Sequence, residues 1–229
     1  MSEQQDCRAW LKAAPYIDVH CHWSDNQALI ALISIDLEAD SERPSTSFYS
    51  AGIHPWNIGS DWAHQLDRLE NHPRLLAIGE CGLDSVIAVP MDLQISAFER
   101  QIVLATQWRK PLIIHCVRAF NQLIAIKQRH ADHAKAWIVH GCNSHPELVK
   151  QLLAHGFYLS FGKALLNPGS RAVKSLPLIP VDKLFLETDA ADTINIDAVY
   201  AAAAKIINSD VDSLKRQLAS NFQRVFLDD

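Results

Sequence analysis

Histidine and carboxylate residues stand at the ends of several short apolar segments in this sequence of 229 residues. The clearest pair is His20 and His22, whose side chains would share one face of an extended segment and could chelate one ion. This pair alone is weak evidence, because a buried histidine with satisfied hydrogen bonds would show the same pattern. The combination is stronger, since six residues of metal-binding type close such segments: His20, His22, Glu80, His115, His140 and Asp189.

The chemistry of these six residues favours a pair of metal ions. Imidazole and carboxylate together suit Zn, Mn or Fe, whereas Mg prefers mostly oxygen. A catalytic ion usually keeps one coordination position open, so six ligands fit two ions that share a bridging carboxylate. Two ions roughly 3.5–4 Å apart can stabilise the attacking and leaving oxygens of a phosphoryl displacement. The residue set therefore indicates metal-dependent hydrolysis.

The apolar segments before these residues are short and continuous, as is typical of strands buried on both faces. We expect strands at 16–20, 48–53, 75–79, 112–114, 136–139, 157–161 and 184–186. Amphipathic segments between them predict helices at 61–71, 93–108, 119–128, 146–154, 196–207 and 211–227. This alternation, without a linker, predicts one α/β domain over residues 1–229. In a parallel barrel, functional residues gather where the strands end.

One segment breaks the alternation near the N-terminus. Only residues 23–27 separate the first expected strand from the apolar run at 28–35, which is too short for a crossover helix. We therefore expect the run at 28–35 to be either an antiparallel strand or the helix itself. The polar segment at 38–47 contains Pro44 and is expected as a loop. The prediction is a TIM-type (β/α) barrel with an abbreviated first quarter and seven or eight strands.

Composition excludes several classes of protein. Hydrophobic residues make up 48% of the chain and the net charge is −5, which excludes a disordered chain and argues against a broad basic surface for nucleic acid. A small, locally positive site is still compatible with this charge. The five cysteines form no CxxC pair, so no disulfide framework is expected. No apolar run reaches the ~20 residues of a membrane helix and no signal pattern opens the chain, so we expect a cytoplasmic protein.

Six motifs occur in an order that resembles a known family. They are HCH at 20–22, GIHPW at 52–56, AIGECGLD at 77–84, PLIIHCVRAF at 111–120, IVHG at 138–141 and LETDA at 186–190. This set resembles the TatD family of metal-dependent deoxyribonucleases, within the amidohydrolase-like superfamily of TIM barrels. The resemblance implies a divalent-metal hydrolase that acts on nucleic-acid phosphodiesters, as a 3′-end exonuclease. It also implies two divalent ions (Zn, Mg or Mn).

The resemblance assigns roles to individual residues. The family's metal ligands fall on His20, His22, Glu80, His115, His140 and Asp189, with Glu80 as the bridge. We expect Glu80 and Asp189 to be catalytic, with Asp189 also accepting the proton of the attacking water as general base. The histidine of the family's GIHP motif, which lies near the substrate phosphate, matches His54. The alternative for His54 is a residue that only orders the loop before Pro55.

Departures from the family pattern concern the substrate pocket of this divergent, short member. Trp56 replaces a histidine, and the expected arginine position holds Val117, with Arg118 one step later. We expect Arg118 to clamp phosphate and Trp56 to stack on a base. Their alternatives are a surface arginine and a partly buried loop tryptophan.

These departures leave two other functions open. One is a binuclear hydrolase of an ester, amide or aminoacyl bond. The other is a non-catalytic scaffold stabilised by metal. The expected partner is nucleic acid or another phosphoester substrate, and no membrane and no obligate protein partner is indicated.

Overall fold

Eight strands form a single sheet in which each strand lies parallel to the next along the chain. This order is seen in a computed structural model that describes residues 7, 9–23, 29–39, 47–130, 134–190 and 194–228. The strands are β1 Tyr16–Cys21, β2 Leu29–Asp36, β3 Phe48–Gly52, β4 Leu75–Asp84, β5 Leu112–Val117, β6 Trp137–Val139, β7 Tyr158–Phe161 and β8 Leu184–Leu186.

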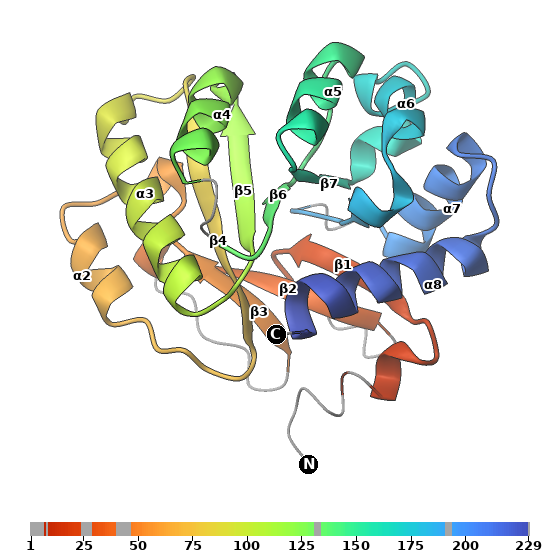
Figure 1. The fold of residues 1–229 in the computed structure, drawn as a ribbon, viewed down its shortest axis with the longest axis horizontal. Coiled ribbons are helices and arrows are strands. Elements are labelled where there is room, and N and C mark those ends of the chain that lie inside the picture. The colour runs from red at the N-terminus through yellow and green to blue at the C-terminus, as the bar shows by residue number, and fades with distance from the viewer. Residues whose placement is uncertain are drawn as a thin grey trace.

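The sheet curls into a barrel that closes at the ends of its first and last strands. An isolated bridge joins Cys21 to Asp189, and the Asp189 amide donates to the His20 carbonyl at 2.9 Å. Helices surround the strands (Figure 1): α2 Trp62–Asp67, α3 Met91–Gln107, α4 Phe120–Arg129, α5 Pro146–Ala154, α6 Arg171–Ser175, α7 Ile196–Ile206 and α8 Val211–Phe222. The predicted TIM-type barrel is confirmed, with eight strands.

Both predictions for residues 28–35 were wrong. This segment is strand β2, which pairs in parallel with β1 from Tyr16 opposite Leu29. A return to the start of the sheet does not require a helix. The seven residues 22–28 can span roughly 23–25 Å when extended, which exceeds the length of a six-residue strand. Of the loop expected at 38–47, residues 40–46 lie outside the described residues, and Leu37–Ala39 forms a 3₁₀ turn.

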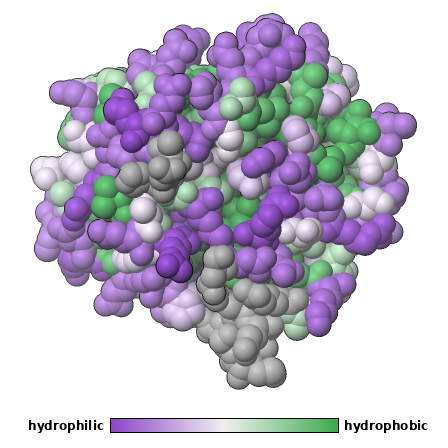
Figure 2. All heavy atoms as spheres, viewed as in Figure 1, coloured by the Kyte–Doolittle hydropathy of each residue, from purple (hydrophilic) through white to green (hydrophobic). Residues whose placement is uncertain are grey.

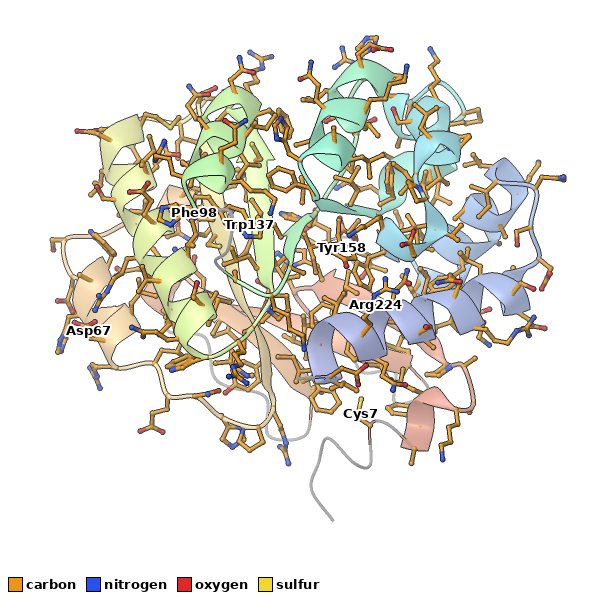
Figure 3. All side chains as sticks on the ribbon, viewed as in Figure 1. Cys7, Asp67, Phe98, Trp137, Tyr158 and Arg224 are labelled. Carbon is orange, nitrogen blue, oxygen red and sulfur yellow. The ribbon has the colours of Figure 1, made fainter. Side chains whose placement is uncertain are left out.

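Two buried clusters stabilise the barrel. The larger one lies between the strands and the helices, where the Phe98 ring of α3 packs edge-on to Trp137 (Figure 3). The smaller one fills the barrel interior, where Ile17, Ile113 and Phe185 pack with Phe222 and with Phe226 of the π-helical turn Gln223–Leu227. The C-terminal segment therefore closes the barrel end that lies away from the C-terminal ends of the strands.

Hydrophilic residues cover much of the face drawn in Figure 2, with apolar side chains visible between them. Among the described residues, no helix is both long and apolar enough to cross a bilayer.

Candidate metal centre

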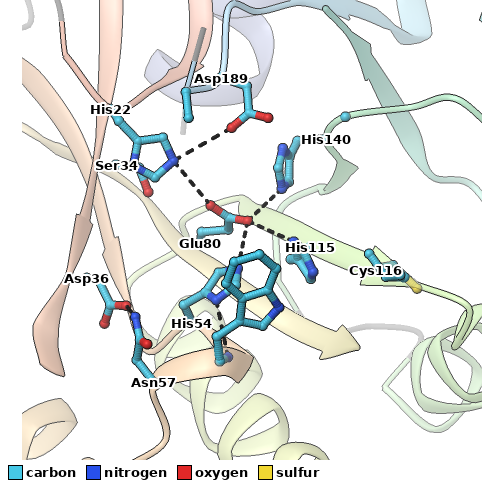
Figure 4. Close-up of a pocket in the computed structure, with 14 residues that line it drawn as sticks. His22, Ser34, Asp36, His54, Asn57, Glu80, His115, Cys116, His140 and Asp189 are labelled. Carbon is cyan, nitrogen blue, oxygen red and sulfur yellow. Dashed lines mark hydrogen bonds and ion pairs between the residues drawn. The ribbon is translucent and has the colours of Figure 1, made fainter. Parts of the chain in front are cut away.

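The ends of five strands bring the six predicted ligands to one mouth of the barrel. His20 and Glu80 lie within β1 and β4, His115 lies within β5, and the other three follow β1, β6 and β8. A cavity of about 540 Å³ opens here, lined by His22, Glu80, His115, His140 and Asp189 among others (Figure 4). His20 is fully buried beneath them.

Glu80 stands at the centre because strand β4 is irregular around it. The pairing of β4 with β5 shifts register between Ile78 and Cys81. Gly79 and Gly82 on either side have φ values of +139° and +140°, and a Cβ on either would collide with the carbonyl of Ile113 or His115. Only glycine allows this close approach. The GECG sequence thus produces the local backbone that holds Glu80 at the barrel mouth.

The two oxygens of Glu80 face different groups of histidines. Its Oε2 lies 3.1 Å from His20 Nε2 and 3.9 Å from His22 Nε2. Asp189 Oδ1 lies 3.6 Å from both of these nitrogens, so these four residues form one group. On the other side, Oε1 lies 3.0 Å from His115 Nδ1 and 2.7 Å from His140 Nε2. This division is the arrangement expected of a carboxylate shared between two cation sites.

The buried histidines fit the role of metal ligands. Both ring nitrogens of the fully buried His20 lack a partner in hydrogen-bond geometry among the described residues, and Nε2 has only its ion-pair contacts with Glu80 and Asp189. Unpaired buried polar atoms are costly, so such nitrogens call for a partner. Three groups of side chains, each with ligand atoms within 4.8 Å of one another, could hold an ion: His20–His140–Asp189, His20–His22–Glu80 and His54–Glu80–His115.

Opposite charges among these side chains shift the pKa values of the site. Burial alone would raise the pKa of Glu80, but His140 and His20 hold that pKa well below its usual range. Burial and His140 would lower the pKa of His20, yet Glu80 and Asp189 raise it to about 9. Burial would also raise the pKa of Asp189, but the imidazoles of His20 and His22, each 3.6 Å from its Oδ1, lower it instead. A cation that binds these histidines must therefore displace protons.

The hydrogen bonds of His54 define its tautomer. Its Nδ1 accepts a hydrogen bond from the Trp56 backbone amide at 3.2 Å, so the proton of the neutral ring lies on Nε2. Nε2 therefore donates to Glu80 Oε1 at 3.0 Å. A ring held in this tautomer offers a donor, not a lone pair, to the centre of the cavity. The geometry thus favours His54 as a hydrogen-bond donor over a metal ligand.

Asp84 is a site residue that the sequence interpretation missed. Its Oδ2 lies 3.2 Å from His115 Nε2 and accepts a hydrogen bond from the Trp56 indole at 2.7 Å. Burial would raise the pKa of Asp84, but the hydrogen bonds from Trp56, the Val86 amide and His115 lower it. Asp84 therefore fixes His115 with Nδ1 toward Glu80. The only signal in the sequence was its place at the end of the GECGLD motif.

Glu187 and Asp18 support the centre from beneath. Glu187 is fully buried, lies 3.6 Å from His140 Nδ1 and accepts from the Gly141 amide at 2.5 Å. Asp18 accepts from the Thr188 hydroxyl at 2.6 Å and from its amide at 3.1 Å. These bonds hold the segment after β8 that carries Asp189. Sequence reasoning gave Glu187 no role.

Helix α3 fixes two of the site segments through glutamines seven residues apart, which lie on one helix face. Gln94 accepts from the Asp84 amide at 2.7 Å and donates to its carbonyl at 2.9 Å. Gln101 accepts from the Ile53 amide at 2.8 Å and donates to its carbonyl at 3.2 Å. The two side chains thus set the backbone on which Asp84 and His54 stand.

The predicted substrate residues lie in different places. His54 and Trp56 line the cavity, and Trp56 is 59% exposed. Arg118 is exposed, has a left-handed φ of 52° and is not among the described residues that line the cavity. Val117, beside it, does line the cavity. Of the described residues that line the cavity, none is lysine or arginine.

A family model described as TatD related DNase matches residues 33–227. A protein described as the 3′-5′ ssDNA/RNA exonuclease TatD of Erwinia tasmaniensis is 34% identical over 159 residues, which are 65% of this chain and 60% of the relative. The protein of the same description from Erwinia amylovora is 29% identical over 201 residues, 77% of either chain. The chain thus spans less than two thirds of the first relative.

Solved structures share the fold. A TatD homologue from Escherichia coli K12 superposes with a TM-score of 0.80 at 22% identity, covering 97% of this chain and 99% of that one. A hydrolase of the TatD family from Entamoeba histolytica gives a TM-score of 0.74 at 14% identity, covering 93% and 98%. Both agree with the eight-stranded barrel described above.

Proposed function

Because this chain belongs to the TatD related DNase family, we propose that it is a two-metal phosphodiesterase that removes nucleotides from the 3′ end of single-stranded DNA or RNA. The observation that carries the proposal is the division of ligands around Glu80, with His20, His22 and Asp189 facing Oε2 and His115 and His140 facing Oε1. Two relatives described as single-stranded DNA/RNA exonucleases support the substrate class.

The six predicted ligands would hold two divalent ions, of which Zn, Mn and Mg are the candidates. When bound, the ions would lower the pKa of the attacking water and stabilise negative charge on the phosphate. Glu80 and Asp189 offset part of their charge, so the cavity keeps a positive centre that attracts an anion. This local charge explains how a chain of net charge −5 can bind nucleic acid.

Asp189 is assigned as the general base. Its side chain is 30% exposed, so it reaches both the ligand group around His20 and the open cavity. Burial would raise the pKa of Asp189, but the nearby imidazoles of His20 and His22 lower it and keep the carboxylate ionised, which is the form that accepts a proton. Water attacks phosphorus, Asp189 takes the water's proton, and the bond to the preceding sugar oxygen breaks. That oxygen gains a proton from solvent, and a nucleoside 5′-monophosphate leaves.

His54 and Trp56 are assigned to the substrate. The Nε2–H of His54 can donate to a non-bridging phosphate oxygen in place of Glu80 Oε1. The exposed ring of Trp56 offers a stacking surface for a base, an interaction that tolerates any sequence. Arg118 lies outside the set of residues that line the cavity, and its binding of the substrate phosphate stays a prediction. The expected cytoplasmic location likewise stays a prediction.

The test is degradation of a 5′-labelled single-stranded oligonucleotide by Mn²⁺-loaded protein. Stepwise shortening is expected for the wild type, and Asp189→Asn should lower the rate by at least about 100-fold, since general-base catalysis contributes about 10²–10⁴. Circular dichroism checks that the variant is folded. Full activity of Asp189→Asn would refute the assignment of the base.

A second candidate function is hydrolysis of an uncharged ester, amide or aminoacyl bond. The observation in its favour is Val117, an apolar side chain in the cavity wall where the family pattern has arginine. A panel of ester, amide and aminoacyl substrates with the same metal ions separates the two functions. Turnover of a neutral substrate without any oligonucleotide shortening would favour this candidate.

A further inference from the structure

One wall of the cavity is polar but contains none of the proposed metal ligands. It consists of Ser34 and Asp36 from the end of β2 and Asn57 from the 3₁₀ turn Pro55–Asn57 (Figure 4). Ser34 and Asp36 are two positions apart in the strand, so they share one face. We call these three residues the acceptor wall, because of the hydrogen-bonding groups that it presents.

Two hydrogen bonds hold the Asp36 carboxylate in place and leave some of its acceptor positions available. Its Oδ2 accepts from Asn57 Nδ2 at 2.5 Å and its Oδ1 accepts from the Glu38 amide at 3.1 Å. A carboxylate offers about four acceptor positions, so about two stay available to a molecule in the cavity. Among the described residues, no lysine or arginine forms an ion pair with Asp36.

Asn57 adds a second hydrogen-bond acceptor to this wall. A carboxylate only accepts hydrogen bonds, so the amide nitrogen of Asn57 must face Asp36, and its carbonyl oxygen is the group left over. A wall of carboxylate and amide oxygens binds hydroxyl or amino groups and repels phosphate. The hydroxyl of Ser34 can either donate or accept a hydrogen bond.

We propose that the acceptor wall selects a terminal nucleoside that presents free hydroxyl or amino donors and no terminal phosphate. This inference rests on the proposed function, which places the scissile phosphate at the metal centre. A cavity of about 540 Å³ is of the size that encloses one small ligand such as a terminal nucleotide. The 3′-hydroxyl of that nucleotide, or an amino group of its base, then meets Asp36. A 3′-phosphate in the same position would be repelled by the negative charge of the Asp36 carboxylate.

Binding of product-like nucleotides tests this directly. Isothermal titration of Mn²⁺-loaded protein compares thymidine 5′-monophosphate with thymidine 3′,5′-bisphosphate and with the 3′-deoxy analogue of the monophosphate. We expect the monophosphate to bind about 10- to 100-fold more tightly than the 3′-deoxy analogue, as for loss of a hydrogen bond to a charged group. The bisphosphate should bind more weakly still. Cytidine nucleotides, whose base carries an amino group, distinguish a base donor from a sugar donor.

Asp36→Asn is the matched variant, because it keeps the size of the side chain and removes its charge. It should lose most of the preference for the free hydroxyl and bind the bisphosphate better than the wild type does. Asp212→Asn, on α8 and exposed, is the control and should keep the wild-type preferences. Titration with Mn²⁺ alone should give the same affinity for all three proteins.

The outcomes separate this inference from the proposed function. Suppose that the wild type shortens 5′-labelled oligonucleotides, but Asp36→Asn keeps the wild-type ratio of dissociation constants for the monophosphate and the bisphosphate. The inference is then overturned and the proposed function stands. If the wild type shortens no oligonucleotide and binds none of the nucleotides, both fail. If the wild type shortens the oligonucleotide, and Asp36→Asn changes this ratio of dissociation constants without changing the affinity for Mn²⁺, the inference and the proposed function are both supported.

Discussion

Replacement of Trp56 by phenylalanine should weaken one metal site without touching a ligand. The indole N–H donates to Asp84 Oδ2 at 2.7 Å, and the same oxygen lies 3.2 Å from His115 Nε2. Trp56→Phe keeps an aromatic ring and removes this donor. Asp84 then holds His115 less firmly in the orientation that turns Nδ1 toward Glu80, 3.0 Å away.

The magnitude follows from the surroundings of the two residues. A hydrogen bond to a charged group contributes about 1.5–3 kcal/mol. Trp56 is 59% exposed, so water can replace part of the lost bond, and the lower end of this range applies. We expect about tenfold weaker binding at the site that contains His115. Asp84→Asn removes the carboxylate itself and should weaken binding by about 10- to 100-fold, as for other groups that orient a metal ligand.

Isothermal titration with Mn²⁺ measures both effects. Trp10→Phe, another exposed tryptophan, is the control and should bind as the wild type does. The site that contains His20 and His22 should keep its affinity in all variants. Wild-type affinity in both Trp56→Phe and Asp84→Asn would refute the reasoning that these residues orient His115.

Three further predictions concern stability. Mn²⁺ at 100 times its dissociation constant should raise Tm by about 5–11 °C per site, and an unchanged Tm would argue against binding to the folded chain. Burial and the neighbouring Lys183 lower the pKa of Lys127 to about 8, so between pH 8 and 10 the unfolded chain binds more protons and the free energy of unfolding rises with pH. In urea unfolding, Lys127→Met should show a smaller rise, and an equal rise would contradict this. Gln101→Ala leaves the buried Ile53 amide and carbonyl unpaired and should lower the free energy of unfolding by about 2–4 kcal/mol, whereas a loss below about 0.5 kcal/mol would show that other groups replace these bonds.

Most of the fold could be predicted because buried parallel strands leave a simple pattern. Seven strands were predicted within a few residues of their observed positions, including β8 with both ends correct. The exception was β2, whose apolar run was expected as a helix or an antiparallel strand. Its parallel pairing with β1 depends on contacts between residues 13 apart, such as Tyr16 and Leu29, which sequence pattern does not record. Strand β4 also runs on to Asp84, through the glycines that place Glu80.

Five of the six predicted ligands stand at or near the end of a strand, which the sequence shows directly. Glu80 is instead the sixth of the ten residues of β4 and reaches the site through the irregular backbone around Gly79 and Gly82. Asp84, Glu187 and Asp36 could not be found in this way. Asp84 and Glu187 act through hydrogen bonds or close contacts to histidines at least 31 residues away, and Asp36 reaches the cavity only because β2 is a strand. Trp56 was expected to stack on substrate, but its bond to Asp84 appears only in three dimensions.

Crystals of the protein soaked in Mn²⁺ and measured at the manganese absorption edge test the two-metal centre, because the anomalous signal locates each ion. We expect two anomalous peaks, one on each side of Glu80: the first beside His20, His22 and Asp189, and the second beside His115 and His140. A single peak, or peaks that do not involve Glu80, would contradict the two-metal centre.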